Sequence, residues 1–164
     1  MFGPGTRDDL AWWTGWGVGA TRQALAATGA VEVRLDDGQA GYVLPDDLEA
    51  TPAPEPWVAL LPVLDATTMG WKDREWYLGP HRAALFDSAG NAGPTIWADG
   101  RIVGGWAQRP DGEIAVRPLE RLDGEIARMI DAEAARLAAW LGPTRIRWPF
   151  PSRGRGLRAH AGSP

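Results

Sequence analysis

The order of local patterns in the first 48 residues constrains the fold more than any other feature of the chain. Thr6, followed three residues later by Asp9, is a capping signal that predicts the start of a helix. The glycines of Gly15-Trp-Gly17 end that helix and suit a tight turn. A second helix is expected from about Val18 to Thr28, with Leu25 facing inward.

A two-stranded hairpin is predicted directly after these helices. Residues 31–35 alternate between apolar and polar side chains, which is typical of a half-buried strand, and residues 41–44 return as the second strand. The sequence Asp36-Asp37-Gly38-Gln39 between them favours a hairpin turn. Helix, turn, helix and hairpin in this order predict a winged helix-turn-helix over residues 2–48.

A second domain is expected after a proline-rich linker at residues 49–56, which contains Pro52, Pro54 and Pro56. It is predicted to be a mixed antiparallel β domain over residues 57–150. The segments that read as strands are residues 58–64, 95–98, 101–108 and 113–117, with a final strand at 144–148.

Turn residues connect the middle strands into a meander. Asp99-Gly100 and Pro110-Asp-Gly112 are both typical of hairpin turns. Gly104 and Gly105 inside the middle strand predict a bulge or a close approach of backbones.

One long helix is predicted over residues 123–141. Asp123 is its cap, and Gly142-Pro143 ends it. Its apolar side chains recur at helical spacing and form one buried face: Ile126, Ile130, Ala134, Leu137 and Leu141. Together the patterns define an α+β protein.

Charge is distributed unevenly along the chain, although the net charge is only −4. Residues 1–50 carry three arginines and eight carboxylates, whereas residues 145–164 carry five arginines and no acid. Residues 151–164 lack apolar periodicity, and we expect a basic disordered tail there. Such a tail is either a weak phosphate-binding arm or, as we favour, a solvated terminus.

Composition excludes several classes of protein. The chain contains no cysteine, so disulfide frameworks, thiol catalysis and cysteine-ligated zinc are excluded. It has no apolar run near the roughly 18 residues of a membrane helix and no signal-peptide layout at its start. A cytoplasmic location without a membrane partner is therefore predicted.

The predicted second helix carries the best candidates for DNA contact. With Leu25 facing inward, Arg22 and Gln23 face outward, and both side chains suit base edges or phosphates in a major groove. Further candidates are Arg34 and Gln39 on the hairpin, and then Arg109, Arg145 and Arg147. The acidic character of residues 1–50 opposes this interpretation, because DNA is a polyanion.

Enzyme chemistry has little support. Residues 15–20 match a dinucleotide-binding pattern, but a helix rather than a strand precedes them. His81 could join Asp65 and Glu75 at a metal, or could form a triad with Ser88 and either Asp65 or Asp87. Neither set has a recognised ligand spacing or nucleophile motif. A structural role for His81 is favoured, and no catalytic residue, metal or cofactor is predicted.

Tryptophan is unusually frequent, with 10 residues. Trp71, Trp76, Trp97 and Trp106 fall in the second domain and could stack on unpaired bases. Core packing is the better interpretation for most of them, although we expect at least one of Trp97 and Trp106 to face outward.

Three long segments resemble the bacterial winged-helix family of the AlkZ- and YcaQ-like DNA glycosylases. They read FGPGTRDDLAWWTGWGVGATRQAL, LLPVLDATTMGWKDREWYLGPHRAALFD and NAGPTIWADGRIVGGWAQRPDGEI, and with the 123–141 helix the resemblance covers residues 2–150. It implies the last winged helix of the family followed by a β-barrel-like domain.

The resemblance also implies a function. The family's glycosylases use a glutamine-containing motif in an N-terminal region that nothing here matches, so no catalytic residue is implied. We therefore expect a non-catalytic protein that binds double-stranded DNA, weakly when alone, with an upstream winged-helix half or a protein partner. An active glycosylase for alkylated or crosslinked DNA and a protein-interaction module without DNA affinity remain the alternatives.

Overall fold

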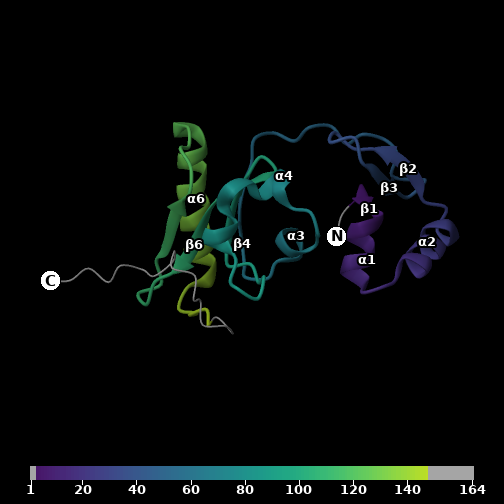
Figure 1. The fold of residues 1–164 in the computed structure, drawn as a ribbon. Coiled ribbons are helices and arrows are strands. Elements are labelled where there is room, and N and C mark those ends of the chain that lie inside the picture. The colour runs from purple at the N-terminus through teal and green to yellow at the C-terminus, as the bar shows by residue number, and fades with distance from the viewer. Residues whose placement is uncertain (1–2, 148–164) are drawn as a thin grey trace. The chain divides into compact units, whose positions relative to one another are not determined.

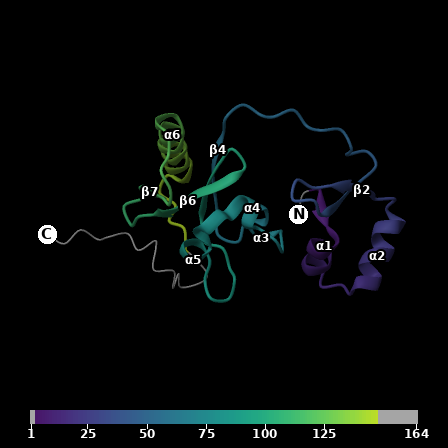
Figure 2. The same ribbon diagram turned by 45° about the horizontal axis from the view of Figure 1, so that its top comes forward.

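The structure is a computed structural model that describes residues 3–147, and the chain divides into two compact units (Figures 1 and 2). Unit 1 comprises Met1–Ala53 and Ala66–Arg74, and unit 2 comprises Pro54–Asp65 and Glu75–Pro164. Residues 66–74, which the sequence placed in the second domain, thus belong to unit 1. The predicted tail at residues 151–164 lies outside the described residues.

Unit 1 combines short helices with a small antiparallel sheet. Its elements are β1 (Gly5–Thr6), α1 (Arg7–Thr14), α2 (Val18–Ala27), β2 (Val31–Arg34), β3 (Ala40–Val43) and α3 (Ala66–Met69). The strand order is β1-β3-β2, so the hairpin predicted from the sequence gains a third strand from the residues before α1. That added strand is only two residues long and was not expected.

Local signals in unit 1 act as predicted. The Thr6 hydroxyl accepts a hydrogen bond from the Asp9 amide at 3.1 Å, and the Asp9 carboxylate accepts one from the Thr6 amide, which completes a capping box. Gly15 ends α1 in the left-handed conformation with φ of 70°. In the hairpin, Gly38 also has a positive φ, and the Leu35 amide bonds the Gln39 carbonyl.

Unit 2 consists of a four-stranded antiparallel sheet, one long helix and several short helical turns. Its elements are β4 (Val58–Leu61), α4 (Glu75–Leu78), η1 (Gly79–His81), α5 (Arg82–Leu85), β5 (Thr95–Ala98), β6 (Arg101–Gln108), β7 (Ile114–Pro118) and α6 (Gly124–Leu141). The strand order β4-β5-β6-β7 describes an open sheet, in place of the barrel-like arrangement that the resemblance implied.

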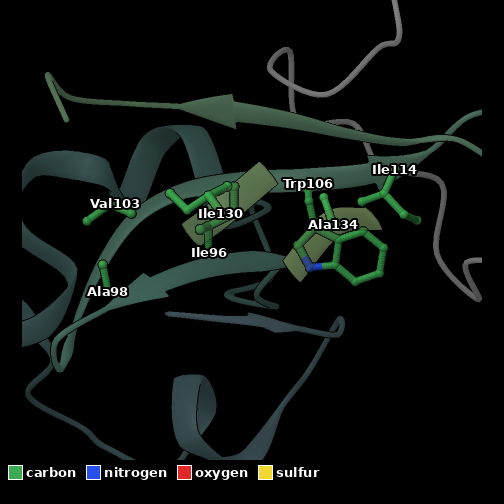
Figure 3. Close-up of a cluster of buried hydrophobic side chains, with 7 residues drawn as sticks. All are labelled: Ile96, Ala98, Val103, Trp106, Ile114, Ile130 and Ala134. Carbon is green, nitrogen blue, oxygen red and sulfur yellow. The ribbon is translucent and has the colours of Figure 1, made fainter. Parts of the chain in front are cut away.

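The core of unit 2 lies between this sheet and α6 (Figure 3). The helix contacts the two outer strands, β4 and β7, and presents Ile130 and Ala134 to the sheet. The buried cluster consists of Ile96, Ala98, Val103, Trp106, Ile114, Ile130 and Ala134. The predicted buried face of the 123–141 helix is therefore confirmed.

One turn, one glycine and one irregularity shape the sheet as expected. Asp99 and Gly100 both have positive φ, at 47° and 84°, as a two-residue hairpin turn requires. A Cβ on Gly104 would lie 2.5 Å from the Arg117 carbonyl oxygen, so the predicted close approach of backbones is present. The register also shifts between Ile96 and Trp97.

Two expectations for unit 2 are wrong. Residues 144–147 form no strand, because the Gln108 side chain bonds the Thr144 carbonyl and the Ile146 amide, at 3.0 and 2.8 Å, in place of a strand ladder. Trp97 and Trp106 are both buried, at 4% and 2% exposed. Both faces of the sheet are covered, since Trp106 packs in the α6 core and Trp97 stacks on Tyr77 of α4 at 5.1 Å.

Candidate nucleic-acid interface

Helix α2 presents the two strongest candidates for DNA contact. Thr21 is buried and donates its hydroxyl to the Gly17 carbonyl at 3.1 Å, while Leu25 is half-buried. Arg22 and Gln23 are exposed, as the helical spacing from Leu25 predicts. One face of α2 therefore contacts its own unit, and the other offers a guanidinium and an amide to solvent.

The N-terminus of α2 is accessible as well. Its N-cap is Gly17, which makes no side-chain capping bond, and its first turn contains no acidic residue. A Cβ at Gly17 or Gly19 would meet nothing within 4 Å. The first amides of a helix lack partners within the helix and carry partial positive charge, so their exposure here suits an anion brought by a larger ligand.

The two candidates on the hairpin differ in whether their side chains already form hydrogen bonds within the protein. Arg34 lies at the end of β2 and is exposed. Gln39 donates its side-chain amide to the Asp37 carboxylate at 2.7 Å and its backbone amide to the same group at 2.8 Å. These hydrogen bonds lower the pKa of Asp37. Arg34 is therefore the better placed of the two for contact with a ligand.

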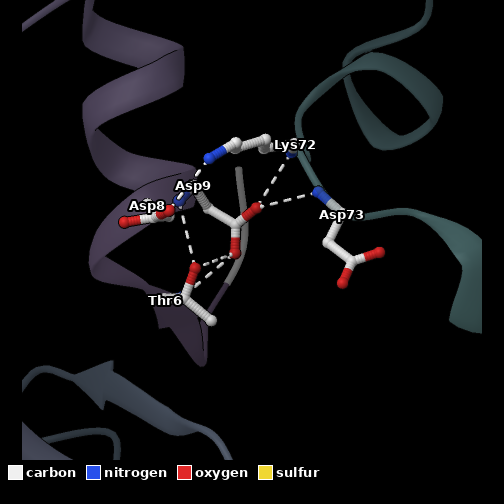
Figure 4. A network of polar contacts seen from close by, with 5 residues as sticks. All are labelled: Thr6, Asp8, Asp9, Lys72 and Asp73. Atoms are coloured by element: carbon white, nitrogen blue, oxygen red, sulfur yellow. Dashed lines mark hydrogen bonds and ion pairs between the residues drawn. The ribbon is translucent and has the colours of Figure 1, made fainter.

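A polar network joins α1 to residues 66–74 of the same unit (Figure 4). The buried Asp9 carboxylate accepts hydrogen bonds from the Lys72 amide at 2.9 Å and the Asp73 amide at 3.3 Å, in addition to those from Thr6. Beside it, the Lys72 ammonium bonds Asp8 at 2.9 Å and lowers the pKa of that carboxyl. Of the eight acids in residues 1–50, Asp8 is thus paired with a cation and Asp9 is hydrogen-bonded by amides.

An arginine strengthens the same junction. Arg74 is buried, donates to the Trp71 carbonyl at 2.9 Å and places its guanidinium 5.3 Å from the Trp12 ring centroid. Sequence reasoning missed this junction, because nothing local in residues 66–74 indicates that they return to α1. The capping pattern predicted only the hydrogen bonds between Thr6 and Asp9 at the start of α1.

The three candidates for DNA contact in unit 2 differ in how many contacts their side chains make with the protein. Arg109 forms an ion pair with Glu113. Arg145 donates to the carbonyls of Pro110 and Asp111, at 3.0 and 2.7 Å, and also to those of residues 142 and 144. Its guanidinium therefore fastens the chain after α6 to the β6–β7 turn. Arg147 is exposed.

His81 has a structural partner. Its Nε2 lies 3.3 Å from the Glu120 Oε2, and Arg101 forms an ion pair with the other oxygen of that carboxylate. Burial raises the pKa of Glu120, but the hydrogen bonds and charges of Arg101 and His81 outweigh burial and bring the pKa below its ordinary value. No group of three or more metal-ligating side chains occurs among residues 3–147.

Asp87, one of the two carboxylates considered for the triad, is bonded within its own turn. The Asp87 carboxylate accepts hydrogen bonds from the amides of Ala89 and Asn91 and from the Asn91 side chain, all within one turn. These bonds lower the pKa of Asp87. The carboxylate that reaches His81 is Glu120, from the segment after β7. The structural interpretation of His81 is therefore supported.

The tryptophans of the predicted second domain are mostly core residues. Trp71, Trp97 and Trp106 are buried, whereas Trp76 is 64% exposed. Further exposed tryptophans are Trp12, Trp13 and Trp16, on α1 and after it, and Trp140 on α6. In the part of the chain that the structure describes, no helix is long and apolar enough to cross a membrane.

Together these features describe an α+β protein with a helix-and-hairpin unit that exposes Arg22, Gln23 and Arg34. The model of the AlkZ-like DNA glycosylase family matches residues 1–140, and the chain belongs to this family.

Two comparisons, both with AlkZ from Streptomyces sahachiroi, support the assignment. The chain is 31% identical over 114 residues to an interstrand DNA cross-link repair glycosylase, a match that covers 67% of this chain and 30% of the relative. The solved structure of the DNA glycosylase AlkZ superimposes with a TM-score of 0.67 and 27% identity, covering 84% of this chain and 40% of that one. The chain therefore spans less than half the length of the relatives that it matches.

Proposed function

We propose that this chain is the DNA-binding part of a DNA-repair protein of the AlkZ-like family and supplies no catalytic residue itself. The observation that carries the proposal is the family match over residues 1–140. The curated relative is a cross-link repair glycosylase, and this chain spans 30% of it. Base-release chemistry is therefore not assigned to these residues.

Unit 1 is, in this proposal, a winged helix with α2 as its recognition helix. Two helices followed by an antiparallel hairpin support that interpretation. Arg22 and Gln23 are the side chains that would reach base edges, since arginine pairs with guanine and glutamine with adenine in the major groove. The accessible amides at the start of α2 would receive a backbone phosphate.

The other candidates take secondary places. Arg34 would contact a phosphate from the hairpin, with Gln39 beside it. In unit 2, Arg147 would be the strongest candidate, because Arg109 and Arg145 already bond protein groups. Since residues 1–50 have a net charge of −5, we expect weak affinity for double-stranded DNA, raised by an upstream winged-helix half or a protein partner.

The test is fluorescence anisotropy of a labelled DNA duplex titrated with the chain at two salt concentrations. Arg22→Ala should weaken binding and lower the salt slope by about one. The matched control is Arg7→Ala, which removes the same charge from an exposed position on α1 and should change binding less. A version ending at Phe150 measures the contribution of the basic residues beyond it.

Each outcome decides between the alternatives. Equal affinity of Arg22→Ala and the unaltered chain would remove α2 from the interface. Binding lost only with the truncation would assign DNA affinity to the basic tail. Release of a base from an alkylated duplex would make the chain an active glycosylase. The absence of binding at low salt would favour the interaction-module alternative.

A further inference from the structure

Unit 1 contains an open apolar cavity of about 370 Å³. It lies between α1, α2 and β3, and the large side chains that line it are Leu10, Trp16, Leu25, Tyr42, Val43 and Leu44. No lysine or arginine lines it, and Asp47 is its one charged lining residue among those described. The site is thus an apolar hollow with an acidic group at its edge.

The described residues of unit 1 leave this hollow open. Leu10, Leu25 and Val43 are only half-buried, and Trp16 and Leu44 are each 51% exposed. Within the described part of unit 1, Trp71 is the one hydrophobic residue that is buried. Contiguous exposed apolar surface of this kind, next to polar residues, is typical of an interaction site.

The surrounding charge indicates what kind of partner fits. Asp46 and Glu49 are exposed and lie beside Asp47 in the sequence, so three carboxylates occur together at this edge of the cavity's lining sequence. A partner with cationic residues beside its apolar face complements this surface, whereas duplex DNA is repelled by it. Binding sites usually enclose a small apolar ligand. Here such a ligand would leave Trp16 and Leu44 exposed at the rim, so a larger partner fits the cavity better.

We propose that the cavity is a docking site for an amphipathic protein helix whose apolar face is flanked by lysine or arginine. Large apolar anchors one helical turn apart would enter between α1 and α2, as in other helix-in-groove complexes. Trp16 and Leu44 would be buried by the partner, and its cations would lie near Asp47.

This site is separate from the surface proposed for DNA. Thr21, Ala24, Leu25 and Thr28 of α2 line the cavity, whereas Arg22 and Gln23 do not. The two surfaces therefore use different faces of one helix. A variant that blocks the cavity can leave Arg22 and Gln23 in place.

The experiment uses the full chain labelled with 5-fluorotryptophan, with the Trp16 resonance assigned from Trp16→Phe by ¹⁹F NMR. The probe is an amphipathic leucine–lysine peptide of about 14 residues, roughly four helical turns. A leucine–glutamate peptide of the same pattern is the charge control. We expect the lysine peptide to shift the Trp16 resonance and the glutamate peptide to leave it unchanged.

Substitutions locate the binding site. Ala24→Phe fills the cavity and should weaken the lysine peptide about tenfold or more, whereas Ala27→Phe, on the exposed side of the same helix, should not. Leu44→Ser removes an exposed rim side chain without touching a core, and should also weaken binding. Asp47→Asn should weaken it less.

Three results would overturn the proposal. One is an unshifted Trp16 resonance at saturating lysine peptide. A second is equal affinity of the peptide for the Ala24→Phe, Leu44→Ser and unaltered chains, which would reduce the interaction to surface charge. A third is a Trp16 shift caused by duplex DNA and abolished by Ala24→Phe, which would assign the cavity to nucleic acid.

Discussion

The two units of the molecule bury their apolar residues to different extents. Of the 15 hydrophobic residues that are buried among those described, 14 lie in unit 2 and only Trp71 lies in unit 1. Unit 2 has a sheet and a long helix that pack on each other, whereas helices α1 and α2 of unit 1 border an open cavity. Polar contacts therefore have a larger share in holding unit 1 together.

The comparison indicates that the two units have different tasks. A closed apolar core stabilises a unit on its own, because burial of apolar area is the main favourable contribution to folding. A unit with half-buried apolar residues retains accessible apolar surface that a partner can bury. Unit 2 is thus expected to be the more stable one, and unit 1 the one that responds to binding.

The largest predicted effect tests the cores directly. Ile130→Ala removes a fully buried side chain between α6 and the sheet, and should lower the free energy of unfolding of unit 2 by about 3–4 kcal/mol. Leu25→Ala, from a half-buried position in unit 1, should cost about 1–2 kcal/mol. Hydrogen exchange of amides in α6 and α2 measures the two units separately. Equal costs would contradict the comparison.

The next effect tests the polar junction of unit 1. Asp9→Asn keeps the shape of the side chain but replaces a buried carboxylate that accepts four hydrogen bonds, and should cost about 2–3 kcal/mol. Asp8→Asn removes an exposed partner of Lys72 and should change stability little. Urea unfolding of both variants measures the difference. A small effect at Asp9 would mean that the other contacts of residues 66–74 with α1 are sufficient to hold them.

A smaller effect concerns the sheet of unit 2. Gly104→Ala would place a Cβ 2.5 Å from the Arg117 carbonyl oxygen, so the β6–β7 backbones must separate, at a cost of about 1–2 kcal/mol. Gly124→Ala at the start of α6 meets nothing within 4 Å and should be neutral or slightly stabilising. Thermal unfolding of the pair checks this expectation. Tolerance at Gly104 would show that the sheet adjusts more easily than its packing suggests.

The smallest effect is a pH dependence. Because its pKa is lowered on folding, Glu120 stabilises unit 2 above the ordinary glutamate pKa of about 4.3, and this stability is lost as the pH falls through the lower, folded value. Glu120→Gln should flatten the dependence of unfolding free energy on pH in that acidic window. The measurement is urea unfolding between about pH 3 and 6. An unchanged slope would mean that other carboxylates dominate there.

Sequence patterns predicted the elements whose causes are local. The capping box at Thr6, the left-handed turn at Asp99-Gly100 and the inward position of Leu25 each depend on residues within one or two turns. The outward position of Arg22 and Gln23 follows from the same spacing, and their contact with DNA stays a prediction.

The features that sequence patterns missed depend on residues far apart in the chain. Asp9 counted as one of the repelling acids of the first domain, yet its carboxylate is bonded by amides 63 and 64 residues away. Arg145 was a DNA candidate because its charge is visible in the sequence, whereas the carbonyls that hold it are not. The cavity was missed for the same reason, since Leu10, Leu25 and Val43 are ordinary core residues by pattern alone.

The return of residues 66–74 to unit 1 limits how the two units can be exchanged by recombination between genes. The chain passes between the units three times, near residues 53, 65 and 74. A single recombination breakpoint therefore cannot transfer one complete unit to another gene, because it would separate Asp9 from the amides of Lys72 and Asp73 or divide the sheet that contains β4. We therefore expect the two units to be inherited together as one segment.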